Sequence, residues 1–123
     1  MFELGGTTVR VVTATEPATV LEVTLEAGSG AGPHTHTREE ETIAVVGGRL
    51  LVDDGTRREL GAGEAHVLPR GLRHSFANES DAPVRALFFC APGGLERFFR
   101  DVAAADTDEA VAAAAARAGL RFG

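Results

Sequence analysis

Tryptophan, tyrosine and lysine are absent from the 123-residue sequence, and cysteine occurs once, at position 90. Without a phenol or an indole, neither group can anchor a ligand or donate a proton. A single cysteine excludes an internal disulfide. The net charge of -6 argues against a nucleic-acid partner, because binding to phosphates needs a basic face.

Long apolar runs are also missing. No run approaches the roughly 20 residues that span a bilayer, and the first residues lack the basic region and apolar stretch of a signal peptide. No nucleophile motif, phosphate-binding loop or dinucleotide fingerprint occurs. We therefore expect a cytoplasmic protein with no membrane partner, and its length fits one domain.

Short apolar runs between glycines and prolines predict about nine β-strands. In the second of them, Leu21, Val23 and Leu25 alternate with polar residues, which is the period of a half-buried strand. Turn signals recur about every 8–12 residues, which indicates a sandwich or a barrel. The predicted strands cover residues 9–15, 19–27, 34–36, 42–46, 49–53, 57–60, 65–68, 74–78 and 84–90.

The composition changes after residue 92. An apolar face at helical spacing in residues 95–102 predicts one helix. Asp106 and Thr107 can cap a second, alanine-rich helix that runs to about residue 118 and is closed by Gly119. We therefore expect a β-barrel domain over residues 1–92 and a helical extension over residues 93–123, packed on the barrel or on a partner subunit.

The segment from residue 34 to residue 45 has the pattern of a metal site. Residues i and i+2 of a strand face the same side, so His34 and His36 would direct two imidazoles into one space. Glu41 opens the next strand, and a hairpin can bring its carboxylate beside them. By the same parity, Ile43 and Val45 would line this space. The alternative is a pair of surface histidines near a charged loop.

The mixture of imidazole and carboxylate points to the kind of ion. It suits Fe, Mn, Ni, Co or Zn, whereas Ca and Mg prefer shells made only of oxygen. We therefore expect a divalent transition metal.

Two stretches resemble the two sequence motifs of the cupin family. The first consists of Gly28, five residues, His34-Thr35-His36, four residues, Glu41, six residues and Gly48. The second consists of Gly63, five residues, Pro69-Arg70-Gly71, two residues, His74, three residues and Asn78. The motifs fill residues 28–78, and the strand pattern extends the resemblance to residues 9–92.

The resemblance implies an all-β fold, the double-stranded β-helix or jelly-roll barrel of cupins, here with a short C-terminal helical extension. It also implies that His34, His36, Glu41 and His74 hold one divalent metal ion per chain. Such a shell leaves up to two positions of an octahedron open to substrate, water or dioxygen.

Other residues are candidates for the pocket around the ion. A strand that leaves the Pro69 turn would send His74 and Phe76 inward together. On the last strand, either Phe88 with Cys90 or the opposite side of the strand faces the pocket, and a small buried hydrophobe is the simplest interpretation of Cys90.

Two further side chains carry alternative interpretations. His66 is a candidate acid or base, and alternatively an ordinary packed or surface histidine. Arg70 is a candidate for holding an anionic substrate, and alternatively a solvated side chain.

A lone barrel followed by Gly-Gly-Leu-Glu-Arg-Phe-Phe also resembles the quercetin dioxygenase-like bacterial cupins. This implies a metal-dependent dioxygenase of a small aromatic or enolisable substrate, with Glu41 as ligand and proton acceptor. Two alternatives stay open, a non-redox Zn cyclase or isomerase as in polyketide-cyclase-like cupins, and a metal-containing binding module without turnover. Cupins commonly pair through edge strands, and an open edge at residues 9–15 would need covering, so we expect a homodimer.

Overall fold

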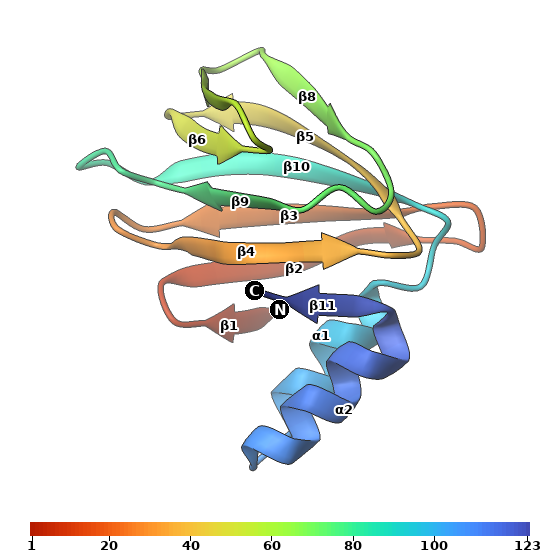
Figure 1. Ribbon diagram of the computed structural model, residues 1–123. Helices are drawn as coiled ribbons and strands as arrows, with labels where there is room; N and C mark the ends of the chain where they lie inside the picture. The colour runs from red at the N-terminus through yellow and green to blue at the C-terminus, as the bar shows by residue number, and fades with distance from the viewer.

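Two antiparallel β-sheets face each other in the computed structural model, which describes residues 1–123 (Figure 1). The first sheet has the order β1 (Phe2–Leu4), β2 (Thr7–Ala14), β3 (Thr19–Leu25), β10 (Val84–Ala91), β5 (Glu40–Gly47) and β8 (Ala65–Leu68). The second has the order β11 (Leu120–Phe122), β4 (Gly30–His36), β9 (His74–Ala77), β6 (Leu50–Asp53) and β7 (Arg57–Leu60). The predicted all-β cupin fold is confirmed, although the sheets do not join into a closed barrel.

The alternation of residue types explains how the sheets form a core. Every second residue of β3, from Thr19 to Leu25, is buried, and so is every second residue of β10, from Val84 to Cys90. These side chains meet those of the opposite sheet because alternate residues of a strand face opposite sides. The largest fully buried apolar side chains are Leu21, Leu25, Ile43, Leu50, Leu68, Val52 and Val84.

The short strand β1 was not predicted, and it covers one end of the edge that the sequence analysis expected to be open. It pairs with residues 7–9 of β2, with Phe2 opposite Val9. The other side of β2 pairs with β3. No strand pairs with residues 10–14 on the outer side of β2, so most of the expected open edge is present. The homodimer stays a prediction, and sedimentation equilibrium tests it.

The two predicted helices are present as α1 (Glu96–Ala104) and α2 (Asp108–Ala118). Thr107 caps α2 by accepting a hydrogen bond from the Ala110 N–H, and Gly119 ends it in the left-handed conformation, with φ of 73°. The helix α1 contacts β1, and α2 contacts β11. The helices therefore lie along the side of the molecule where each sheet has an edge (Figure 1).

The sequence analysis expected a helical extension over residues 93–123. Residues 120–122 instead form the strand β11. This strand pairs with β4, so that Leu120 lies opposite His36 and Phe122 opposite His34. Hydrogen bonds hold both of its ends: Thr37 donates to the Gly119 carbonyl through its N–H and its hydroxyl, and the Gly123 N–H donates to the Pro33 carbonyl. The extension thus supports the strand that carries two histidines. None of the helices has the length and apolarity to cross a membrane.

Candidate metal centre

Three buried histidines meet on the inner face of the second sheet. His34 and His36 come from β4, and His74 comes from the neighbouring strand β9, directly opposite His34. Their nitrogen ligand atoms lie within 4.8 Å of one another. Bonds from imidazole nitrogen to Zn are about 2.0–2.1 Å long, so small shifts of the rings would bring all three nitrogens onto one ion.

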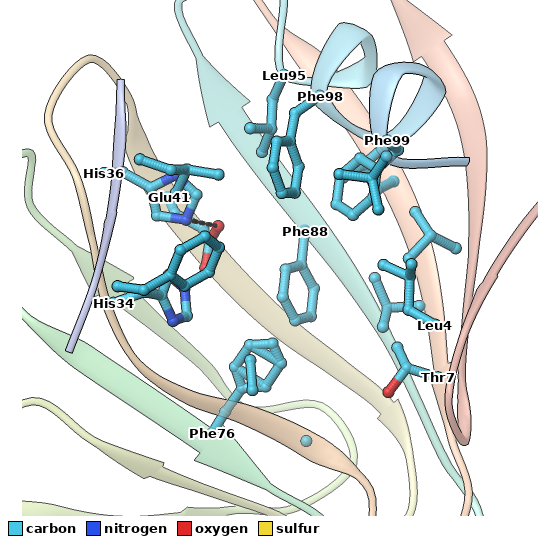
Figure 2. Close-up of a pocket in the computed structure, with 18 of the residues that line it drawn as sticks. Leu4, Thr7, His34, His36, Glu41, Phe76, Phe88, Leu95, Phe98 and Phe99 are labelled. Atoms are coloured by element: carbon cyan, nitrogen blue, oxygen red, sulfur yellow. Dashed lines mark ion pairs between the residues drawn. The ribbon is translucent and has the colours of Figure 1, made fainter. Parts of the chain in front are cut away.

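Glu41 reaches the same point from β5 of the opposite sheet. Its Oε2 lies 3.2 Å from His36 Nε2, and its Oε1 lies 3.6 Å from His74 Nε2. Figure 2 shows the carboxylate of Glu41 against the ring of His36 at one end of a cavity. The structure therefore brings together all four residues that the sequence nominated as metal ligands.

The outer nitrogens of two rings are held by backbone carbonyls. His34 Nδ1 donates to the Gly32 carbonyl at 2.8 Å, and His74 Nδ1 donates to the Leu72 carbonyl at 3.0 Å. A proton held on Nδ1 leaves the Nε2 lone pair free to bind a cation. Both rings are therefore oriented as metal ligands are in proteins.

Unpartnered polar atoms test whether these residues fit a metal ion. Glu41 Oε1 and His74 Nε2 are buried and have no hydrogen-bond partner. Buried polar atoms are rarely left unsatisfied because the lost hydration is costly. A divalent transition ion would satisfy both atoms, and a set of three imidazoles and one carboxylate is chemically suited to it.

The carboxylate and its nearest imidazole change each other's acidity. Burial alone would raise the pKa of Glu41, but the nearby imidazoles of His36 and His74 outweigh it and lower that pKa to about 2. Burial alone would lower the pKa of His36, and the carboxylates of Glu39 and Glu41 outweigh it, raising that pKa. For His34, burial is the largest effect and lowers the pKa. Glu41 is thus anionic and His34 neutral at neutral pH.

A cavity of about 290 Å³ opens beside three of these residues, and His74 does not line it. Its only polar lining side chains are those of Thr7, His34, His36 and Glu41, the last three gathered at one end (Figure 2). The apolar lining is Leu4, Val9, Leu21, Val23, Ala31, Phe76, Phe88, Leu95, Phe98, Phe99, Val102, Val111, Leu120 and Phe122. The volume is near the lower end of the range for small-molecule sites.

Of the residues proposed to contact a substrate, Phe76 and Phe88 line the cavity, with ring centroids 5.2 Å apart. The expectation for Ile43 and Val45 requires a correction. Both face inward, as parity indicated, but they are packed in the core and do not line the cavity. The reason is their position along β5, because this strand reaches the cavity only near its start, at Glu41, and continues from there into the core.

The expectations for His66 and Arg70 also require correction, since neither lines the cavity. His66 lies on β8, opposite Ile43 of β5, and its Nε2 donates to Asp54 Oδ2 at 2.8 Å. Arg70 is exposed and donates from Nε to the Arg38 carbonyl at 2.8 Å. The cavity therefore has no arginine to hold an anion.

Two parts of the site were missed. The C-terminal extension supplies a large share of the cavity wall, including Phe98 from α1 and Leu120 from β11. The apolar face at residues 95–102 was the available signal, but nothing in the sequence showed where it packs. Glu39 was also missed, although it lies two residues before Glu41, at the same parity.

Residues 21–90, a segment that includes all four candidate ligands, match the family described as Cupin domain. A relative from Streptomyces cyaneus named Polyketide synthase CurC is 38% identical over 66 residues, which are 53% of this chain and 43% of that protein. The chain thus spans less than half the length of this relative.

Solved structures agree on the fold. KdgF from a Halomonas species superposes with a TM-score of 0.71 at 23% identity, over 76% of this chain and 86% of that one. A recombinant oxalate oxidase in complex with glycolate has a TM-score of 0.62 at 29% identity, over 72% of this chain and 53% of that one.

Proposed function

This chain belongs to the cupin family, and from that premise we propose that it is a metal-dependent dioxygenase of a small aromatic or enolisable molecule. The observation that supports the proposal is the position of His34, His36 and Glu41 at one end of a cavity that is otherwise almost wholly apolar. An ion at that end faces the space a substrate would fill.

The lining restricts the substrate. Apart from His34, His36 and Glu41 it contains no acidic or basic side chain, and five phenylalanines contribute to its wall. An oxygen substituent would face the donor end and an apolar body would pack against the aromatic wall. A small dianion such as oxalate is a poor fit, because it would leave the apolar wall without a partner and no lysine or arginine lines the cavity to add to the charge of the ion.

A divalent transition ion held by His34, His36, Glu41 and His74 would supply a Lewis-acidic centre, redox-active in the case of Fe, Mn or Ni. The residues themselves contribute a base and a dry environment. Glu41 is ionised, so a carboxylate oxygen that does not bind the ion can accept the proton of a substrate hydroxyl. Phe76 and Phe88 exclude water from the same space.

Oxygen uptake tests this proposal. Metal-free protein is reloaded with Fe, Mn or Ni and mixed with a panel of flavonols and catechols in an oxygen electrode. We expect uptake with at least one redox metal, its loss in Glu41→Gln, and its retention in Glu40→Gln, a change at the adjacent exposed carboxylate. No uptake with any redox metal contradicts the proposal.

A second candidate is a non-redox cyclase or isomerase that uses Zn. The relative named Polyketide synthase CurC favours it, because the apolar cavity also suits a polyketide-like molecule. Turnover by Zn-loaded protein under anaerobic conditions would support this function over a dioxygenase. Tight binding of the panel without any product would instead indicate a binding module.

A further inference from the structure

Glu39 is a buried carboxylate without an ordinary partner. It precedes β5, its side chain is 1% exposed, and neither of its oxygens has a hydrogen bond. A buried anion is expensive to maintain unless a nearby group compensates its charge. The opposite charge or dipole that stabilises it should therefore lie close by.

The nearest such group is a ring of the metal centre. Glu39 Oε1 lies 3.6 Å from His36 Nδ1, the nitrogen on the side of the ring away from Glu41. His36 Nδ1 is itself buried and has no hydrogen-bond partner. The imidazole of His36 therefore lies between two carboxylates, with Glu41 beside Nε2 and Glu39 beside Nδ1.

The other two histidines show what this position does. In His34 and His74 the Nδ1 proton is accepted by the backbone carbonyl two residues earlier. His36 has no such carbonyl bond, and the side chain that faces its Nδ1 is Glu39. In metal sites this outer acceptor fixes the tautomer and the orientation of the ring. A carboxylate in this position makes the imidazole a stronger electron-pair donor to the metal than a carbonyl does.

We propose that Glu39 is a positioning residue that holds the Nδ1 proton of His36 and directs its Nε2 to the metal ion, an inference that rests on the metal centre proposed above. When the three imidazoles bind an ion as neutral ligands, the carboxylates of Glu39 and Glu41 balance its two positive charges. The carboxylate beside Nδ1 then makes His36 the strongest electron-pair donor of the three histidines.

The chain supplies its own control. Residues 39–41 are three consecutive glutamates, of which the first and third are buried and the second is exposed. Glu39→Gln removes one charge with almost no change of shape, and Glu40→Gln does the same one residue away, outside the site. Only Glu39→Gln should weaken metal binding.

The test is Co²⁺ titration of metal-free wild type, Glu39→Gln and Glu40→Gln against a competing chelator. We expect Glu39→Gln to weaken Co²⁺ binding by about 10–100-fold and to shift the visible absorption of bound Co²⁺, while Glu40→Gln matches wild type. Affinity of Glu39→Gln within about twofold of wild type overturns the inference. A wild type that binds no Co²⁺ refutes the metal centre itself, which is a separate outcome.

Nitrogen-15 spectra of the imidazoles in Zn²⁺-saturated protein add a readout that a general loss of stability would not produce. We expect the His36 Nδ1–H resonance to move in Glu39→Gln while those of His34 and His74 stay in place. Equal changes at all three rings would overturn the positioning role. If circular dichroism shows that Glu39→Gln does not fold, Glu39→Asp keeps the charge but shortens its reach, and the same titration and spectra apply.

Discussion

His66 donates from Nε2 to Asp54 Oδ2 at 2.8 Å, and this bond joins the two sheets at the end of the molecule away from the cavity. His66 belongs to β8, an edge strand of the first sheet, whereas Asp54 lies in the turn between β6 and β7 of the second. Arg58 donates to the other oxygen, Oδ1, at 3.2 Å. The three side chains form a polar link between the sheets and are not part of the candidate metal centre.

This link predicts a specific pH dependence of stability. The hydrogen bond from His66 is the main cause that lowers the pKa of Asp54 from 3.8 to about 2. A lowered folded-state pKa stabilises the protein above the unfolded-state value, and this contribution is lost as pH falls from about 4 toward 2. We expect Asp54→Asn to cost about 1 kcal/mol in free energy of unfolding at pH 7, with the difference from wild type shrinking over that acid range.

Urea unfolding at a series of pH values checks this expectation. Asp81→Asn is the control, because Asp81 is exposed and makes no ion pair or side-chain hydrogen bond. A deficit of Asp54→Asn that stays constant down to pH 2 would show that the Asp54 charge is not involved.

The thiol of Cys90 should be unreactive in the folded protein. Burial is the main cause that raises its pKa, followed by the charges of Glu41 and Glu39, and its Sγ donates to Glu41 Oε2 at 3.8 Å. Reactivity requires an exposed thiolate. We expect labelling by a thiol reagent to be at least about 100-fold slower in native protein than in denaturant. Comparable rates would contradict the buried position.

A change in the part of the cavity wall that α1 supplies should lower stability without removing the metal ion. Phe98 is 9% exposed and packs in the core beside the cavity. Phe98→Ala should cost about 3 kcal/mol in free energy of unfolding, because a large buried side chain is lost, and should leave the metal content at one ion per chain.

Phe89→Ala is the matched control for that prediction. Phe89 is 40% exposed on the outer face of β10, so its loss should cost less than about 1 kcal/mol. Urea unfolding and elemental analysis measure both effects. Loss of metal in Phe98→Ala would show that the helix supports the ligands directly.

The residues of the candidate metal centre were predictable from the sequence because the information is local. The parity of His34 and His36 along one strand, and the turn before His74, determine which way each ring points. Glu41 opens the next strand, so a hairpin is enough to bring its carboxylate beside these rings. The same parity rule places Glu39 inward, next to a candidate ligand. Parity alone does not show which group its carboxylate contacts.

The errors concern features that depend on the relative placement of distant elements. Ile43 and Val45 face inward as predicted, but the elements that pack around them decide whether an inward residue meets the cavity or the core. His66 could not be paired with Asp54 because the two lie on different sheets. The strand β11 is only three residues long and directly follows a helix, so it carries almost no periodic signal.

Metal content tests the central claim most directly. Wild type and His74→Ala, both purified without an affinity tag, are reconstituted with Mn, Fe, Co, Ni or Zn, freed of unbound ions and measured by elemental analysis against protein concentration. We predict one ion per chain in wild type and a large loss of that ion in His74→Ala. A wild type that retains no transition metal, or a variant that retains as much as wild type, would contradict the claim that these side chains share one ion.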